Sequence, residues 1–241
     1  MHLHVVYNPA CGDKTAKPFF HDHVLPFLKG NDKQYASLIE TSHEGHAGEV
    51  VSGLMSSSLS GEETLDIVLG SGDGTLHEIV NGYFALSKSQ SDEARRKVRV
   101  VLVPCGTANA LYASLYPPPP APSVEAQKKE QDLEYRLRSL KEYIGGQARD
   151  VPLSFGVTRL VDSKGKDREL VSSVVISTSL HAAILRDSEA LRDEYPGIER
   201  CVMYLRVSLE YRAYGTALKG SRLLLRRTVT SGTGQASSFS L

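Results

Sequence analysis

The segment DIVLGSGDGTLHEIVNG, residues 66–82, decides how the first half of this chain folds. The apolar run that opens it predicts a short strand, and the spacing of apolar residues beyond the glycines predicts a helix over residues 75–86. Between them lie Gly70, Gly72 and Gly74, which leave no side chain between the backbone and a ligand. A strand, a glycine loop and a helix in this order point backbone N–H groups at an anion, which indicates a phosphate-binding loop.

Asp73 lies inside this loop. Its carboxylate would repel a phosphate unless it binds a metal ion or takes a proton from the attacking hydroxyl, and both roles suit a kinase. A tight turn in which Asp73 only caps the following helix gives the same glycine spacing. The loop alone leaves both interpretations open.

Strand and helix patterns alternate along the first half of the chain. Strands are predicted at residues 2–7, 35–40, 66–69 and 98–103, and helices at residues 17–28, 45–57 and 75–86. The last strand is apolar throughout, as in a strand that is buried on both faces of a parallel sheet. The expected fold class is α/β, with an N-terminal, Rossmann-like, three-layer domain around a mostly parallel sheet.

The pattern changes at residues 117–120, which are four consecutive prolines. They cannot continue a helix or a central strand, so they predict a stiff, exposed loop. An amphipathic helix follows, because Leu133, Leu137, Leu140 and Ile144 recur at helical spacing among charged residues. We expect this helix to pack on the first domain.

Strand-like segments follow residue 151 and enclose one helical stretch. The strands are predicted at residues 153–160, 170–177 and 222–229, and the helix at residues 188–217. The Ser/Gly-rich end is predicted to be disordered. The expected divisions are a first domain over residues 1–150, a partial β-rich second domain over 151–230 and a disordered tail over 231–241.

Two other strands of the predicted sheet end in turns. The segment NPACG, residues 8–12, follows the first strand, and PCGTAN, residues 104–109, follows the strand at residues 98–103. In an open α/β sheet, the loops at the carboxyl ends of the strands gather around one crevice. The residues expected to come together there are Asn8, Gly12, Asp73, Gly106 and Thr107.

These three motifs, in this order, resemble those of the diacylglycerol kinase catalytic-domain superfamily. Sphingosine and ceramide kinases have a similar order of motifs. Many bacterial lipid kinases carry glycine at the position of Ser71, so the serine makes this loop resemble that of the sphingosine kinase branch more closely. The resemblance implies a kinase that uses ATP and Mg²⁺ to phosphorylate a hydroxyl of a sphingoid base, diacylglycerol or a related lipid. Residues 1–150 would then be the nucleotide-binding kinase domain, and residues 151–230 a partial lipid-binding domain.

The resemblance also implies roles for individual residues. Asp73 would be the general base for the lipid hydroxyl. The residues expected at the nucleotide, from the matched motifs and the loops around them, are Asn8, Gly12, Thr41, Ser71, Gly72, Gly74, Thr75, Gly106 and Thr107.

Four further side chains each have two interpretations. Lys14 either adds positive charge near the phosphates or is a surface lysine. Glu78 lies one turn inside the helix and either orients partners or caps the site. Arg192 and Arg200 resemble a family segment whose arginines reach the ATP phosphates, whereas arginines on a polar helix face are usually only solvated.

Two departures from the family pattern bear on substrate and activity. Leu185 stands where sphingosine kinases place an aspartate that holds the lipid head group, and His181 nearby is either a different head-group ligand or structural. The sequence stops before the family's later strands and its acidic Asp-Gly-Glu segment, so we expect a C-terminally truncated form. A catalytically impaired nucleotide-binding or interaction protein is one alternative. A soluble-substrate kinase related to NAD kinases is another.

Composition limits the partners and the compartment. Lys plus Arg and Asp plus Glu each total 28, so no net charge attracts nucleic acid, and any membrane contact must be local. Cys11, Cys105 and Cys201 are too scattered for a disulfide framework or a zinc site. The first residues lack a signal-peptide pattern, and residues 171–185 are too polar and too short to span a bilayer. We expect a cytoplasmic protein that meets its lipid substrate by peripheral membrane contact.

Overall fold

The computed structural model describes residues 3–56, 64–87, 97–120, 125–161, 165–174, 179–195, 199–204 and 239–240. The chain forms two compact units, Met1–Ile176 with Ser238–Leu241, and Ser177–Ser237. The boundary between the units therefore lies after residue 176 and not at residue 150. The expected functional division at that residue stays a prediction.

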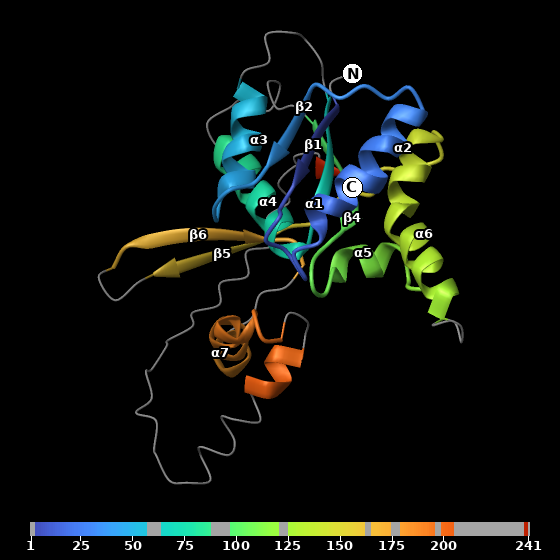
Figure 1. The fold of residues 1–241 in the computed structure, drawn as a ribbon. Coiled ribbons are helices and arrows are strands. Elements are labelled where there is room, and N and C mark those ends of the chain that lie inside the picture. Colours follow the sequence, from blue (N-terminus) through green and yellow to red (C-terminus); the bar gives the residue numbers. More distant parts are fainter. Residues whose placement is uncertain are drawn as a thin grey trace. The chain divides into compact units, whose positions relative to one another are not determined.

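The first unit is built on a parallel sheet with strand order β2-β1-β3-β4-β7 (Figure 1). Its strands are β1 (Leu3–Tyr7), β2 (Ser37–Glu40), β3 (Thr64–Ser71), β4 (Lys97–Pro104) and β7 (Phe239–Ser240). In the register of the sheet, Tyr7 lies beside Gly70, and Ser71 lies beside Pro104. The strands β1, β3 and β4 therefore end at the same edge of the sheet, and the loops that follow them start side by side.

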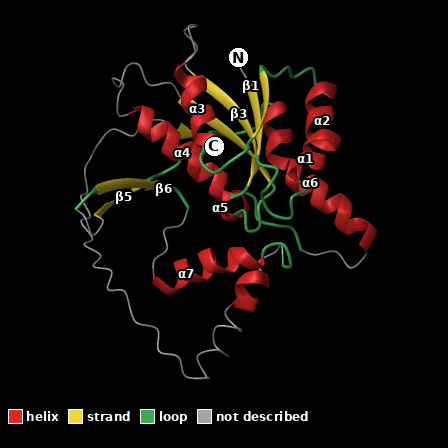
Figure 2. Cartoon of the chain, turned by 60° about the vertical axis from the view of Figure 1, so that its left-hand side comes forward, coloured by secondary structure: helices red, strands yellow, loops and turns green. Residues whose placement is uncertain are grey.

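Helices cover both faces of this sheet (Figure 2). One face carries α1 (Ala16–Phe19), the π-helical turn η1 (Phe20–Val24), α2 (Leu25–Gly30) and α6 (Glu125–Ile144), and the other carries α3 (His46–Ser56) and α4 (Asp73–Ser87). A short helix, α5 (Ala110–Leu115), follows β4. The predicted α/β fold with three layers is confirmed.

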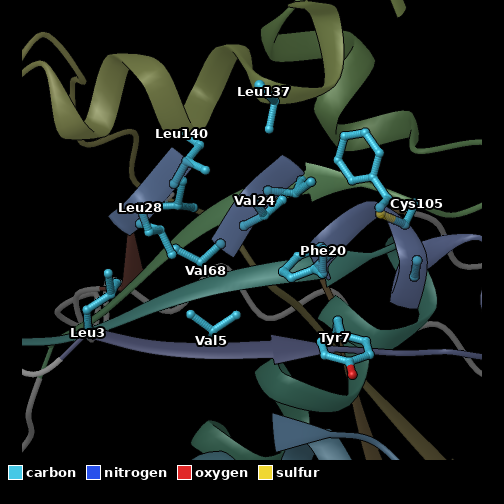
Figure 3. Close-up of a cluster of buried hydrophobic side chains, with 14 of the residues drawn as sticks. Leu3, Val5, Tyr7, Phe20, Val24, Leu28, Val68, Cys105, Leu137 and Leu140 are labelled. Atoms are coloured by element: carbon cyan, nitrogen blue, oxygen red, sulfur yellow. The ribbon is translucent and has the colours of Figure 1, made fainter. Parts of the chain in front are cut away.

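Alternate residues of each strand supply the two cores, because successive side chains of a strand point to opposite faces. Leu3, Val5 and Tyr7 of β1 lie in the cluster beneath η1, α2 and α6 (Figure 3), whereas Val6 packs with α3 and α4. Leu140 of α6 is fully buried in the first cluster. The predicted packing of this amphipathic helix on the first domain is thus confirmed.

The later elements differ from the sequence expectation in their bounds. An antiparallel hairpin of β5 (Gly156–Val161) and β6 (Asp167–Ser172) belongs to the first unit. In the second unit, α7 (Ser179–Asp187) and the 3-10 turn η3 (Ser188–Leu191) precede the helical residues 199–204. The predicted helix thus begins earlier than residue 188, because alanine and leucine within α7 favour a helix.

Two other expectations concern segments that the structure describes only in part. The strand predicted at residues 222–229 lies outside the described residues. Of the tail at residues 231–241, only Phe239–Ser240 is described, and it forms β7 beside Val98 and Arg99. The expectation of a disordered tail stays a prediction for the other tail residues.

A buried charge network ties β3, β4 and α6 together. The Asp66 side chain, in a residue that is 1% exposed, accepts hydrogen bonds from Arg99 Nη1 at 3.1 Å and from Tyr143 Oη at 2.6 Å. Arg99 also binds Asp150 through its Nε at 2.8 Å. Burial, followed by the hydrogen bond to Asp66, raises the pKa of the Tyr143 phenol above its ordinary value. Removing one partner of a buried carboxylate destabilises the fold, because the buried negative charge is then less well compensated.

We expect Tyr143→Phe to lower the free energy of unfolding by about 1.5–3 kcal/mol, the contribution of a hydrogen bond to a charged group. The change keeps the aromatic ring and leaves the Asp66 carboxylate with one partner fewer. Urea unfolding measures the effect, and Tyr35→Phe, at an exposed tyrosine, is the matched control. Equal stability of both variants would show that the Tyr143 hydroxyl does not stabilise the network.

Candidate functional site

Three loops meet at the carboxyl ends of β1, β3 and β4. Asn8 Nδ2 donates to Thr75 Oγ1 at 3.0 Å, which joins the loop after β1 to the first turn of α4. Gly12 has a positive φ of 55°, and a Cβ at this position would lie 2.4 Å from the carbonyl oxygen of Cys105. The loop after β1 therefore lies directly against the loop after β4.

The loops after β3 and β4 touch through two glycines. A Cβ built on Gly106 would lie 2.4 Å from Gly72 Cα. Asn109 fixes Gly106 from the other side, because its side-chain amide bonds to both the N–H and the carbonyl oxygen of Gly106 at 2.8 Å. Thr107 is exposed in the same loop. The structure thus brings these loops together as the strand order predicted, while the binding roles of their residues stay predictions.

Asp73 is the first residue of α4, and its carboxylate faces the start of α5. The Ala110 N–H donates to Asp73 Oδ2 at 2.7 Å, and the Leu111 N–H donates to Asp73 Oδ1 at 3.1 Å. Asp73 therefore binds the first turn of α5, a helix that the sequence analysis did not predict. Each carboxylate oxygen has two acceptor sites, so these two bonds leave Asp73 able to accept a proton or to bind a cation.

Buried hydroxyl residues border the loops. Ser71, the last residue of β3, is 7% exposed, and its Oγ has no hydrogen-bond partner within the described part of the chain. The Asn8 N–H donates to the carbonyl of Gly70, the residue before Ser71, at 2.9 Å. Thr41 directly follows β2, is buried, and donates its backbone N–H to the Tyr7 carbonyl at 2.9 Å. Thr75 is buried as well.

The remaining candidates of the first unit have different surroundings. Gly74 is exposed, and a Cβ there would meet no heavy atom within 4 Å. Lys14 is exposed and has a positive φ of 64°. Glu78 Oε2 accepts a hydrogen bond from the Ala47 N–H at 3.3 Å, so this carboxylate contacts the first turn of α3. Its two interpretations, orienting partners and capping the site, both stay predictions.

Arg192 and Arg200 lie in the second unit and bind the same carboxylate. Arg192 donates to Glu189 through Nε at 2.7 Å and through Nη2 at 3.0 Å, and Arg200 Nη2 donates to Glu189 at 3.0 Å. These arginines, Arg192 first, lower the pKa of Glu189. Their expected contact with phosphate stays a prediction. Leu185 is exposed on α7, and the side chain of His181 lies outside the described part of the structure.

Asn81 is a residue whose structural role the sequence analysis missed. Its Nδ2 donates to the Val171 carbonyl at 2.8 Å, and its Oδ1 accepts from the Val171 N–H at 3.0 Å. The side-chain amide thus pairs with β6 as a neighbouring strand would, and it attaches the hairpin to the helix that begins at Asp73. Val171 is 1% exposed, so no solvent replaces these two bonds when the amide is removed.

We expect Asn81→Ala to accelerate hydrogen exchange in the β5–β6 hairpin and to destabilise the first unit by about 1–3 kcal/mol, the cost of leaving buried backbone groups unpaired. Hydrogen exchange read by mass spectrometry measures the first effect, and urea unfolding measures the second. Asn31→Ala is the control, because the Asn31 amide binds the Phe27 carbonyl on an exposed helix end. Unchanged exchange in the hairpin would show that other contacts hold it.

A separate cavity lies beside β4 and α6, away from the three loops. It has a volume of about 410 Å³, and its lining includes Arg99, Tyr116 and Tyr143. Its polar groups bind one another, as in the bond from Tyr116 Oη to Glu142 at 2.9 Å. This cavity therefore adds no residue to the candidate site.

The described ranges contain neither a cluster of metal ligands nor a membrane-spanning helix. No three His, Cys, Asp or Glu side chains gather there in an arrangement that could hold a metal ion. None of the helices described is both long and apolar enough to cross a membrane.

Comparison with known proteins confirms the resemblance seen in the three motifs. Residues 2–139 match the family model of the diacylglycerol kinase catalytic domain. Human sphingosine kinase 2 is 38% identical over 113 residues, which are 47% of this chain and 16% of that protein. Sphingosine kinase 1 of Arabidopsis thaliana is 33% identical over 138 residues, 57% of this chain and 27% of that protein.

A relative with another named substrate class also matches. The mitochondrial acylglycerol kinase of Xenopus laevis is 30% identical over 139 residues, 57% of this chain and 28% of that protein. The chain thus spans between 16% and 28% of the length of these three relatives. A solved structure of a putative diacylglycerol kinase from Bacillus anthracis aligns with 69% of this chain and 46% of that chain, with a TM-score of 0.39 and 15% identity.

Proposed function

Since this chain belongs to the diacylglycerol kinase catalytic domain family, we propose that it is an ATP-dependent lipid kinase whose nucleotide site is formed by the three loops. The observation that carries the proposal is the contact of these loops around Asp73, through Asn8 with Thr75 and Gly72 with Gly106. A carboxylate beside a glycine with open space around it, here Gly74, is the combination that phosphoryl transfer to a hydroxyl needs.

The phosphates of ATP would bind along the glycine loop and the first turn of α4. Gly74 leaves the backbone open to a ligand, and the helix N-terminus attracts negative charge. Ser71 Oγ, buried and unpaired within the described residues, would gain a partner from a phosphate oxygen or a bound water. Asn8 and Thr41 directly follow β1 and β2 and would border the same nucleotide site. Lys14, which is exposed, would add positive charge from the loop after β1.

Asp73 would act as the general base. It takes the proton of the lipid hydroxyl, whose oxygen forms a bond to the γ-phosphorus while the bond from that phosphorus to the β,γ-bridging oxygen breaks and ADP leaves. The amides of Ala110 and Leu111 would hold the carboxylate in a fixed orientation during this step. A fixed base avoids the entropic cost of bringing a mobile one to the hydroxyl.

Mg²⁺ fits this donor set as an ion held mainly by ATP. It usually keeps several waters and binds through one or two carboxylates together with substrate phosphates. Asp73 would supply one such carboxylate beside the glycine loop. When bound, the ion would neutralise part of the negative charge on the phosphates.

The acceptor that we propose is a hydroxyl of a sphingoid base, a diacylglycerol or a related lipid. The named relatives include sphingosine kinases and an acylglycerol kinase. Leu185 replaces the head-group aspartate expected for sphingosine, so an acceptor that needs no carboxylate partner fits this position better. A lipid acceptor also implies peripheral contact of the protein with a membrane surface.

Transfer of label from radioactive ATP tests the proposal on this chain. The acceptor panel contains sphingosine, diacylglycerol, monoacylglycerol and NAD, the lipids being offered in vesicles, each with and without Mg²⁺. We expect label on at least one lipid only when Mg²⁺ is present. Binding of ATP without transfer to any acceptor would identify a catalytically impaired nucleotide-binding protein, and label on NAD alone would identify a soluble-substrate kinase.

A further inference from the structure

The four prolines at residues 117–120 form an exposed segment between α5 and α6. Proline has no backbone N–H, so this stretch cannot donate to a helix or a sheet. Its rings face solvent, although four consecutive apolar side chains would ordinarily be covered. The proposed kinase chemistry uses none of these residues.

Local sterics fix the conformation of the segment. The ring of proline holds φ at about −65°. A residue that precedes proline is excluded from the helical region and takes a ψ of about 120–160°. Pro117, Pro118 and Pro119 meet both conditions, and the combination is the polyproline II helix. With three residues per turn in that helix, Pro117 and Pro120 lie on the same face.

Both ends of the segment are fastened to the first unit. Tyr135 Oη donates to the Tyr116 carbonyl at 3.1 Å, and Gln131 Nε2 donates to the Pro120 carbonyl at 3.3 Å. The Tyr116 ring packs on Tyr112 with centroids 5.0 Å apart. The segment is therefore held as a short rod, and a partner that binds it loses little conformational entropy.

We propose that residues 117–120 are a docking segment for a partner domain with an aromatic-lined groove that recognises polyproline II. Such grooves take a proline at one position and again three residues later, as Pro117 and Pro120 are placed. Residues 110–127 contain no Lys or Arg, so this chain offers the groove no basic residue beside the prolines. The partner domain must therefore recognise the proline rings alone. This interaction is independent of nucleotide and lipid.

The test titrates the full chain into isolated, ¹⁵N-labelled SH3, WW and EVH1 domains and follows their NMR spectra. We expect chemical-shift changes at the aromatic groove of at least one domain, and displacement of the chain by an oligoproline peptide. The double variant Pro117→Ala/Pro120→Ala should lose the interaction. Pro26→Ala, at an exposed proline of α2, should retain it.

Absence of shift changes with every domain would overturn the proposal, and so would equal binding by the double variant. Circular dichroism melting establishes whether that variant keeps the fold. If the double variant does not keep its fold, the displacement experiment with the wild-type chain tests the proposal instead. An oligoproline peptide that fails to displace the wild-type chain would show that the chain contacts the domain outside its proline groove, which would overturn the proposal. Label transfer from ATP by the wild-type chain is measured separately, so failure of the kinase proposal is distinguished from failure of this one.

Discussion

Asp73→Asn is expected to lower lipid phosphorylation by about 10²–10⁴-fold, the factor that a general base contributes, while ATP binding is retained. Asparagine has nearly the same shape as aspartate but cannot take the proton of the lipid hydroxyl. Its one side-chain oxygen can still accept from Ala110 or Leu111, so α5 keeps one of its two bonds to this position. Initial rates of label transfer measure the first effect, and calorimetric titration with ATP measures the second.

Asp22→Asn is the matched control for this experiment, because Asp22 is an exposed aspartate of η1 outside the three loops. A purely structural role of Asp73 would give a different result. Loss of the bonds to α5 would then weaken ATP binding and turnover together, and it would accelerate hydrogen exchange at Leu111. Turnover that is unchanged in Asp73→Asn would remove Asp73 from the mechanism.

The position of the candidate site could be predicted because it depends on strand order and on local sequence. Each of the three motifs directly follows an apolar strand, and parallel strands carry such loops to one edge of the sheet. Asn8 and Thr75 are 67 residues apart in sequence, yet their hydrogen bond lies where this rule places it. The glycines were equally informative, since Gly72 and Gly106 are small where two backbones touch.

The hydrogen bonds that fix the site could not be predicted in the same way. Asp73 binds the Ala110 amide 37 residues away, and Asn81 binds Val171 90 residues away. Aspartate at a helix start usually caps its own helix, and nothing local indicates that it caps another. These partners follow from how β4 and the hairpin are placed against α4. Sequence periodicity identifies the elements but not the distance between two particular side chains.

Gly106→Ala is expected to lower kcat/KM for ATP by about 10²-fold, the effect of displacing catalytic groups by about 1 Å. The added Cβ would lie 2.4 Å from Gly72 Cα and 2.9 Å from Gly72 N, and because these two atoms belong to the backbone, no side-chain rotation relieves the overlap with them. One of the two loops must move, and the loop after β3 carries Asp73. Overpacking of this kind also costs about 1–3 kcal/mol of stability, which thermal melting detects.

Gly74→Ala separates this effect from direct contact with the nucleotide. Its added Cβ would meet no heavy atom within 4 Å, so the melting temperature of the free protein should not fall. If phosphate approaches the open side of this loop, the same methyl group weakens ATP binding in a calorimetric titration. A lower melting temperature in Gly106→Ala only, with weaker ATP binding in both variants, is therefore the expected pair of results. Wild-type turnover and melting in Gly106→Ala would mean that the loops after β3 and β4 can separate without loss, and the site would then not depend on their contact.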